Sequence, residues 1–207
     1  MAVRAVLTGD IVNSTRLKKV TEKKLLKMLT AALAKYQFEF YRGDSFQVYV
    51  KNPVEALQTA LLCRTAAMSV SKNETINLSD VRISIGIGAV TMQVKALGTA
   101  KGEAFILSGR AFDEMTGKDT RLVIATANSL ANAGLQIIAD YLNAVLKVMT
   151  GKQAEVIFEL LQGKTQQEVA KLLKKSKSTV HQHVTAGRWS EIEKLLRQYE
   201  NIINQLT

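Results

Sequence analysis

Two aspartates are the residues of this chain best suited to metal chemistry, because each follows a glycine at or inside an apolar run. Asp10 comes after the run Ala2–Gly9, and Asp44 lies inside the run Phe38–Val50. If both runs form adjacent strands, the two carboxylates lie side by side, and like charges that close favour a cation between them. With the carbonyl oxygen of Ile11 and phosphate oxygens, they would form a Mg²⁺ shell. The sequence therefore predicts a metal site at Asp10, Ile11 and Asp44; the alternative is that both aspartates only cap helices or form turns.

A polar turn follows Asp10 and could hold phosphate. The backbone amides of residues 12–15 are expected at the start of the next helix, where amide groups and the helix dipole favour an anion. We therefore expect Asn13, Ser14 and Thr15 to bind the phosphates of a nucleotide held together with Mg²⁺. Arg110 is a further candidate for phosphate binding, or it only pairs with a nearby carboxylate.

Near the carboxyl terminus, two short helices have the pattern of a DNA reader. Thr165 and Glu168 form a capping box that starts the first helix, and Ser176 caps a second helix that Gly187 ends. Apolar residues of both helices can close a small core between two crossing helices, as in a helix-turn-helix. These residues are Val169, Leu173, Val180 and Val184. The alternative is a helical hairpin that makes only protein contacts.

The second of these helices would present a polar face to DNA. Lysine and arginine side chains can neutralise phosphates, and Gln182 can offer a donor–acceptor pair to an adenine edge. The predicted DNA-binding residues are Lys175, Lys177, Ser178, His181, Gln182, Thr185 and Arg188. His181 and His183 point about 200° apart on a helix, so they do not form a metal-binding pair.

Hydrophobic periodicity places these candidates on alternating strands and helices. Strands are expected at residues 2–9, 38–41, 46–50, 81–90 and 121–126, and helices at 21–36, 54–69 and 108–115. Gly86 and Gly88 inside the fourth strand mark a bulge or a close backbone approach. After residue 128 only helical segments follow, beginning with 129–149.

This order predicts an α+β fold with two domains. Residues 1–127 would form a ferredoxin-like βαββαβ domain, with one sheet and its helices on one face. Residues 128–207 would form an all-α domain with the helix-turn-helix at about 150–190. The helix at 129–149 would connect the two domains and transmit a change between them.

Composition limits the classes of protein to which the chain can belong. With 47% hydrophobic residues it can bury a core, and Cys63 is its only cysteine, which excludes a disulfide framework and a thiolate zinc site. A reduced, cytoplasmic location is therefore expected. No segment has the roughly 18 apolar residues of a membrane helix, so no membrane partner is expected. The net charge of +10 is consistent with a polyanionic partner such as DNA.

Three segments of the first domain resemble class III nucleotidyl cyclases: Ala5–Thr15, Phe40–Phe46 and Val81–Gly88. Their Gly-Asp-Ile-Val and Gly-Asp-Ser-Phe-Gln motifs are closer to the SatD-like family of small cyclase-fold proteins. The resemblance covers residues 3–126. It implies a cyclase-like fold, a homodimer, and metal-binding roles for Asp10 and Asp44.

Two positions depart from the cyclase pattern. The family uses an asparagine four residues before an arginine to align the ribose and stabilise the transition state. Arg110 stands at the place of the arginine, but Ile106 stands at the place of the asparagine. The lysine that recognises the base is replaced by Phe40, four residues before the second aspartate. The resemblance therefore implies a catalytically degenerate domain.

Residues 150–190 resemble the helix-turn-helix of LuxR-type regulators and of sigma-factor region 4. The sequence thus predicts a transcriptional regulator that binds DNA and senses a nucleotide with Mg²⁺. One alternative is a nucleotidyl cyclase or other phosphoryl-transfer enzyme that uses Asp10 and Asp44. Another is a protein-interaction module that contacts the transcription machinery.

Overall fold

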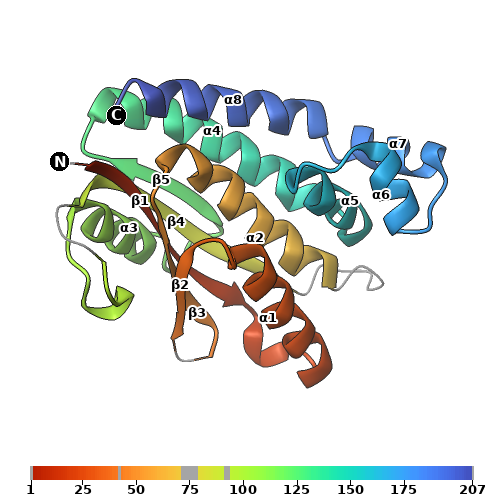
Figure 1. Cartoon of the computed structure of the whole chain (residues 1–207), viewed down its shortest axis with the longest axis horizontal. Helices are drawn as coiled ribbons and strands as arrows, with labels where there is room; N and C mark the ends of the chain where they lie inside the picture. Colours follow the sequence, from red (N-terminus) through yellow and green to blue (C-terminus); the bar gives the residue numbers. More distant parts are fainter. Residues whose placement is uncertain (1, 42, 71–78, 91–93, 207) are drawn as a thin grey trace.

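The computed structural model describes residues 2–41, 43–70, 79–90 and 94–206, and Figure 1 shows how they are arranged. The first part contains β1 (Ala2–Val12), η1 (Ser14–Arg16), α1 (Lys19–Leu33), β2 (Gln37–Tyr41), β3 (Ser45–Val50), η2 (Pro53–Glu55), α2 (Ala56–Val70), β4 (Asp80–Val90), η3 (Leu97–Thr99), α3 (Glu103–Glu114) and β5 (Leu122–Thr126). The second part contains α4 (Ser129–Val148), α5 (Gly151–Leu161), α6 (Gln166–Leu172), α7 (Lys177–Ala186) and α8 (Trp189–Asn204). Among the helices described, none is long and apolar enough to span a bilayer.

The strands form one five-stranded sheet in the order β2-β3-β1-β4-β5. β1 runs antiparallel to both β3 and β4, while β4 and β5 run parallel. Within this register, Asp10 at the end of β1 lies opposite Ser45 on one side and Arg82 on the other. The sheet thus fixes which side chains can meet Asp10.

Helices cover both faces of the sheet, so the prediction that they lie on one face is wrong. α1 and α2 pack on the face that contains Leu7 and Ile85. α3 packs on the opposite face, where Ser108 accepts a hydrogen bond from Thr8 at 3.1 Å and its carbonyl oxygen accepts one from Ser84 at 2.7 Å. The physical reason is that successive strand residues point to opposite faces, and β4 is buried on both of them.

Gly86 allows α3 to lie directly against the sheet. A Cβ at this position would overlap the carbonyl oxygen of Ala104 and the amide nitrogen of Ser108, both in the backbone of α3. The predicted close backbone approach at Gly86 is therefore confirmed. Because helix and strand backbones touch here, the position of α3 depends on the absence of a side chain.

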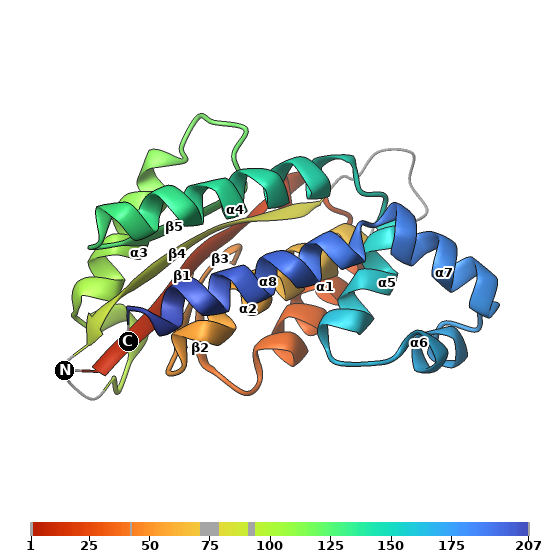
Figure 2. The ribbon, with the colours of Figure 1, turned by 90° about the horizontal axis from the view of Figure 1, so that it is seen from above.

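The helices after β5 share one hydrophobic core with the sheet. α5 packs along α2, and α4 packs along β5. Tyr199 of α8 is fully buried, and its hydroxyl donates to the carbonyl oxygen of Pro53 at 2.8 Å. Figure 2 shows α4 and α8 lying along the sheet and α2, while α6 and α7 extend at one end of the molecule. The division into domains at residue 127 stays a prediction.

The predicted elements are all present, and the main differences concern their ends. β1 continues to Val12, because it stays paired with β4 as far as Asp80. α3 begins at Glu103 instead of residue 108. Gly102, which precedes it, makes no side-chain cap, so no capping residue marks this start in the sequence.

Candidate functional site

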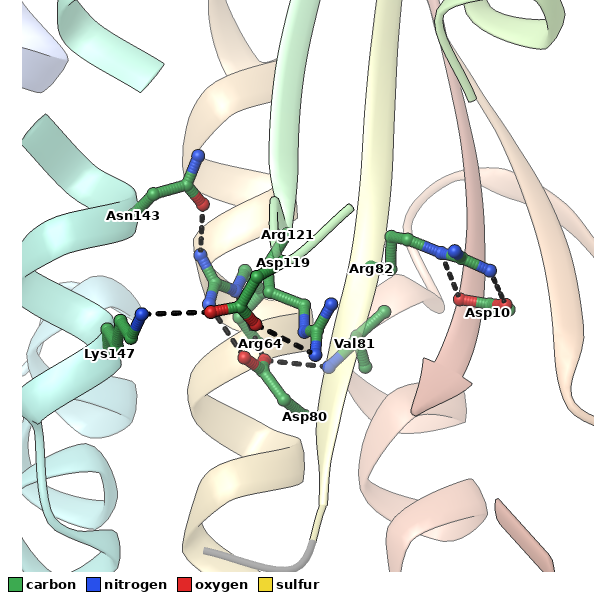
Figure 3. A network of polar contacts seen from close by, with 9 residues as sticks. All are labelled: Asp10, Arg64, Asp80, Val81, Arg82, Asp119, Arg121, Asn143 and Lys147. Carbon is green, nitrogen blue, oxygen red and sulfur yellow. Dashed lines mark hydrogen bonds and ion pairs between the residues drawn. The ribbon is translucent and has the colours of Figure 1, made fainter. Parts of the chain in front are cut away.

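The carboxylate of Asp10 is held by Arg82 from the neighbouring strand. Nε and Nη2 of Arg82 donate to the two carboxylate oxygens at 3.2 and 2.6 Å, and Figure 3 shows the two side chains facing each other. The guanidinium also lies 5.0 Å from the ring centroid of Phe112 on α3, within cation–π range. The pair is neutral and uses both oxygens of Asp10. The sequence analysis missed Arg82, although it is the single charged residue in the apolar run 81–90 and could have been noticed there.

Asp44 lies close to β1 but has different partners. Its Oδ2 accepts a hydrogen bond from the Ser14 hydroxyl at 2.8 Å, and its carbonyl oxygen accepts one from the amide of Ile11 at 3.0 Å. The structure thus brings together three predicted site residues: Ile11, Ser14 and Asp44. Thr15 is exposed in the short turn η1.

The turn after β1 does not begin the long helix that was expected there. Asn13 has a left-handed backbone with φ of 58°, η1 covers Ser14–Arg16, and α1 begins only at Lys19. The amides of residues 12–15 therefore do not lie at the start of α1, as the phosphate-binding prediction assumed.

The donor set at this end of the sheet does not fit a metal ion in the arrangement that the structure has. Both oxygens of Asp10 bind Arg82, and the carboxylate of Asp44 accepts from Ser14. In the part of the chain that the structure describes, no group of three or more acidic, histidine or cysteine side chains is placed to hold a metal. A metal at Asp10 would require Arg82 to release its carboxylate.

Phe40 and Ile106, the two residues that depart from the cyclase pattern, lie in different surroundings. Phe40 packs between Phe38 and Phe46, with ring centroids 5.9 and 5.8 Å away. Ile106 is 54% exposed on α3. Arg110 is exposed on the same helix and, within the described ranges, makes no ion pair. Ile106 and Arg110 lie on α3, whereas Asp10 lies on β1 and is bound by Arg82 of β4.

A polar cavity of about 420 Å³ lies between α2, α4 and the start of β4 and β5. Its floor is Arg64, which is 1% exposed and donates to Asp80 from Nε at 3.1 Å and from Nη2 at 2.7 Å. Nη1 of Arg64 donates to Asn143 of α4 at 3.1 Å (Figure 3). The buried charge is thus paired and hydrogen-bonded on three sides.

The rim of this polar cavity carries a second, exposed group of charges. Asp119 binds Lys147 at 2.8 Å and Arg121 at 3.5 Å. The hydrogen bond from Lys147 is the main cause that lowers the pKa of Asp119. Asn13 also borders the cavity, so this predicted phosphate-binding residue faces a different pocket from the one expected. No sequence pattern pointed to this cavity, because its residues come from five separate segments.

The two helices of the predicted DNA reader have the expected caps and core. Thr165 and Glu168 form a complete capping box at the start of α6, and the Ser176 hydroxyl accepts from the amide of Thr179 at the start of α7. Val180 and Val184 of α7 are buried, and α7 packs against α5 and α6. The opposite side of α7 is left free to face outward.

The outward face of α7 consists of polar side chains. The predicted residues exposed on this helix are Lys177, Ser178, His181, Gln182 and Thr185. α7 contains no acidic residue. This face therefore offers hydrogen-bond donors and positive charge without a carboxylate to repel a phosphate.

The remaining predicted DNA-binding residues have protein partners. Lys175 is half-buried and lies 3.9 Å from Glu155 of α5. Arg188 is exposed, has a left-handed backbone, and binds Glu191 at 3.2 Å. His183 points toward the packed side of α7, where burial, then Lys175 and Lys152, lower the pKa of its imidazole.

A groove of about 610 Å³ borders the same face of α7. His181, Thr185 and Arg188 line it together with Gln166 of α6 and Trp189 of α8. It brings three predicted DNA-binding residues to one concave surface.

Comparison with known proteins shows structural similarity at low sequence identity. No protein-family model matches the chain, and no curated protein matches it. Two solved structures of a bacterial light-regulated adenylyl cyclase are similar to it. One has a TM-score of 0.44 at 16% identity, covering 59% of this chain and 43% of that one. The other has a TM-score of 0.40 at 14% identity, covering 66% and 44%. This chain spans less than half the length of either.

Proposed function

We propose that this protein is a transcriptional regulator that binds DNA with α7, the second helix of a helix-turn-helix. The observation that carries the proposal is the outward face of α7, which is polar, basic and free of acidic residues. Its opposite side is anchored by Val180 and Val184. A helix held in this way can enter the major groove with its side chains toward the base edges.

Charge around α7 supports the same function. Residues 163–188 carry six basic side chains and one acidic side chain, a net charge of +5. Lys171 and Lys174 of this set lie just before α7, where the first helix would cross the phosphate backbone. Lys177 would contact phosphate, while Gln182 would contact a base edge.

For the sheet domain, we propose a ferredoxin-like, cyclase-like unit without catalytic activity, which forms a homodimer. Two features support the absence of cyclase activity. Phe40 packs in an aromatic cluster, and the carboxylate of Asp10 is paired with Arg82. A nucleotide with Mg²⁺ stays a proposal for its ligand.

The ligand proposal is tested by thermal shift with ATP or GTP, with and without Mg²⁺. A ligand that binds only the folded protein raises the melting temperature by mass action. An Mg²⁺-dependent rise that Asp10→Ala abolishes would support the proposal. No rise at millimolar nucleotide would end it, and formation of product would instead favour the enzyme.

DNA binding is tested by fluorescence anisotropy with the full chain and labelled duplexes of random and enriched sequence. We expect binding that weakens as salt increases, because counterions are released from the phosphates. Lys177→Ala and Gln182→Ala should weaken it, whereas the exposed control variants Lys118→Ala and Gln198→Ala should not. If the parent protein does not bind any duplex at low salt, the proposal is wrong. Capture of a protein partner in a salt-insensitive way would then favour the interaction module.

A further inference from the structure

One side of α4 exposes a stripe of large apolar side chains. Leu130 is 83% exposed, Ile137 71%, Tyr141 43% and Val148 80%. Their spacings of seven, four and seven residues place them on one line along a helix with 3.6 residues per turn. We call these four residues the α4 stripe.

The α4 stripe does not contribute to the core of its own chain. The packed side of α4 is formed by other residues, including Leu135, Ile138 and Leu142, which are buried against the sheet and α8. Gln136, Asp140 and Lys147 lie on the other flank of the stripe and are exposed. An apolar line between a core face and a polar face marks a surface that associates with a partner.

The spacing of the α4 stripe is symmetric about residue 139. Leu130 and Val148 are equally far from this centre, and so are Ile137 and Tyr141. The small residues between them, Gly134 and Ala144, are also related by the same centre. A helix with this order presents the same surface when its direction is reversed.

We propose that a second copy of this chain binds through the α4 stripe, with the two α4 helices antiparallel. Leu130 of one protomer would then lie against Val148 of the partner, and Ile137 against Tyr141. An interface with a two-fold axis requires a patch that is complementary to itself, and a reversible stripe meets that requirement. Ala144, which is exposed between Tyr141 and Val148, leaves room for a large side chain of the partner.

The size of the α4 stripe sets the expected strength of the dimer. A stable interface buries about 800 Å² on each partner, which is more than four side chains supply. Half-buried residues of α8, such as Leu195 and Ile202, lie beside α4 and can extend the contact. We therefore expect reversible association at micromolar concentration. This inference rests on the homodimer proposed above, for which it names the interface, and it does not depend on DNA binding.

Sedimentation of the full chain over a range of concentrations tests the surface. Ile137→Lys and Val148→Lys should each raise the dissociation constant at least tenfold, because a charge would be buried against the partner. Val20→Lys is the matched control, since Val20 is as exposed as Val148 but lies on α1, and it should not change association. Circular dichroism shows that each variant is folded. A parent chain that stays monomeric at 200 μM, or a stripe variant that associates like the parent, would overturn the proposal.

Disulfide cross-linking tests the antiparallel arrangement. Cys63, the only native cysteine, is buried and does not compete. Residues 130 and 148 are about 27 Å apart along one helix at 1.5 Å per residue. A mixture of Leu130→Cys and Val148→Cys chains should therefore cross-link, whereas neither variant should do so alone. Cross-linking of each single variant with itself would show parallel helices and would refute the antiparallel pairing.

Discussion

Removal of Asp80 should destabilise the protein strongly, because it leaves the buried charge of Arg64 without its counterion. Arg64 is 1% exposed, and of the three hydrogen bonds that its guanidinium donates to described residues, two go to Asp80. Breaking a buried ion pair by deleting one partner costs about 3–5 kcal/mol. For a chain of this length, 1 kcal/mol corresponds to about 2–4 °C. Asp80→Ala should therefore lower the melting temperature by roughly 6–20 °C.

Calorimetry and urea unfolding measure this effect, and two further variants locate its cause. Asp119→Ala removes a carboxylate that also binds two cations but is 70% exposed, so solvent screens its ion pairs and the melting temperature should fall far less than in Asp80→Ala. The double variant Arg64→Met with Asp80→Ala buries no charge and should recover much of the lost stability. If Asp80→Ala costs as little as Asp119→Ala, the burial of Arg64 does not govern stability, and the reasoning fails.

Three other perturbations follow from the structure. Gly86→Ala should push α3 away from β4 and lower the melting temperature in calorimetry, while Gly109→Ala, where an added Cβ meets nothing, should not. Gln182→Ala should reduce the preference for the best DNA site over sites altered at the contacted base, by about 1–3 kcal/mol in competition anisotropy. The third perturbation is pH. Because the folded state lowers the pKa of His183 below its ordinary value of 6.5, the unfolded chain binds the proton more readily. This contribution to the free energy of unfolding is complete above pH 6.5 and decreases as the pH falls below it, and urea unfolding of His183→Gln should lack this part of the pH dependence.

The carboxyl-terminal helices were predictable because their signals are local. The caps Thr165–Glu168 and Ser176–Thr179 each span four residues, and both form as expected. The hairpin of β2 and β3 is local in the same way. Where the structure of a segment depends on its own neighbours, pattern and periodicity suffice.

The charged pairs were not predictable, because tertiary packing sets them. Arg82 meets Asp10 only through the register of β1 and β4, and the two residues are 72 apart in the sequence. Arg64 lies in an apolar helix, and its burial depends on how α2, β4 and α4 close around it. The metal prediction did not include Arg82, which binds both carboxylate oxygens of Asp10, while Asp44 accepts from Ser14.

The bond between Tyr199 and Pro53 has a consequence for folding during synthesis. The two residues are 146 apart, yet the tyrosine fills a fully buried position against η2. A ribosome releases the sheet-forming residues first and α8 much later. Until Tyr199 emerges, the apolar surface that α8 covers stays open to solvent. We expect nascent chains that stop before Trp189 to hold this surface open, and therefore to depend on chaperones that shield it.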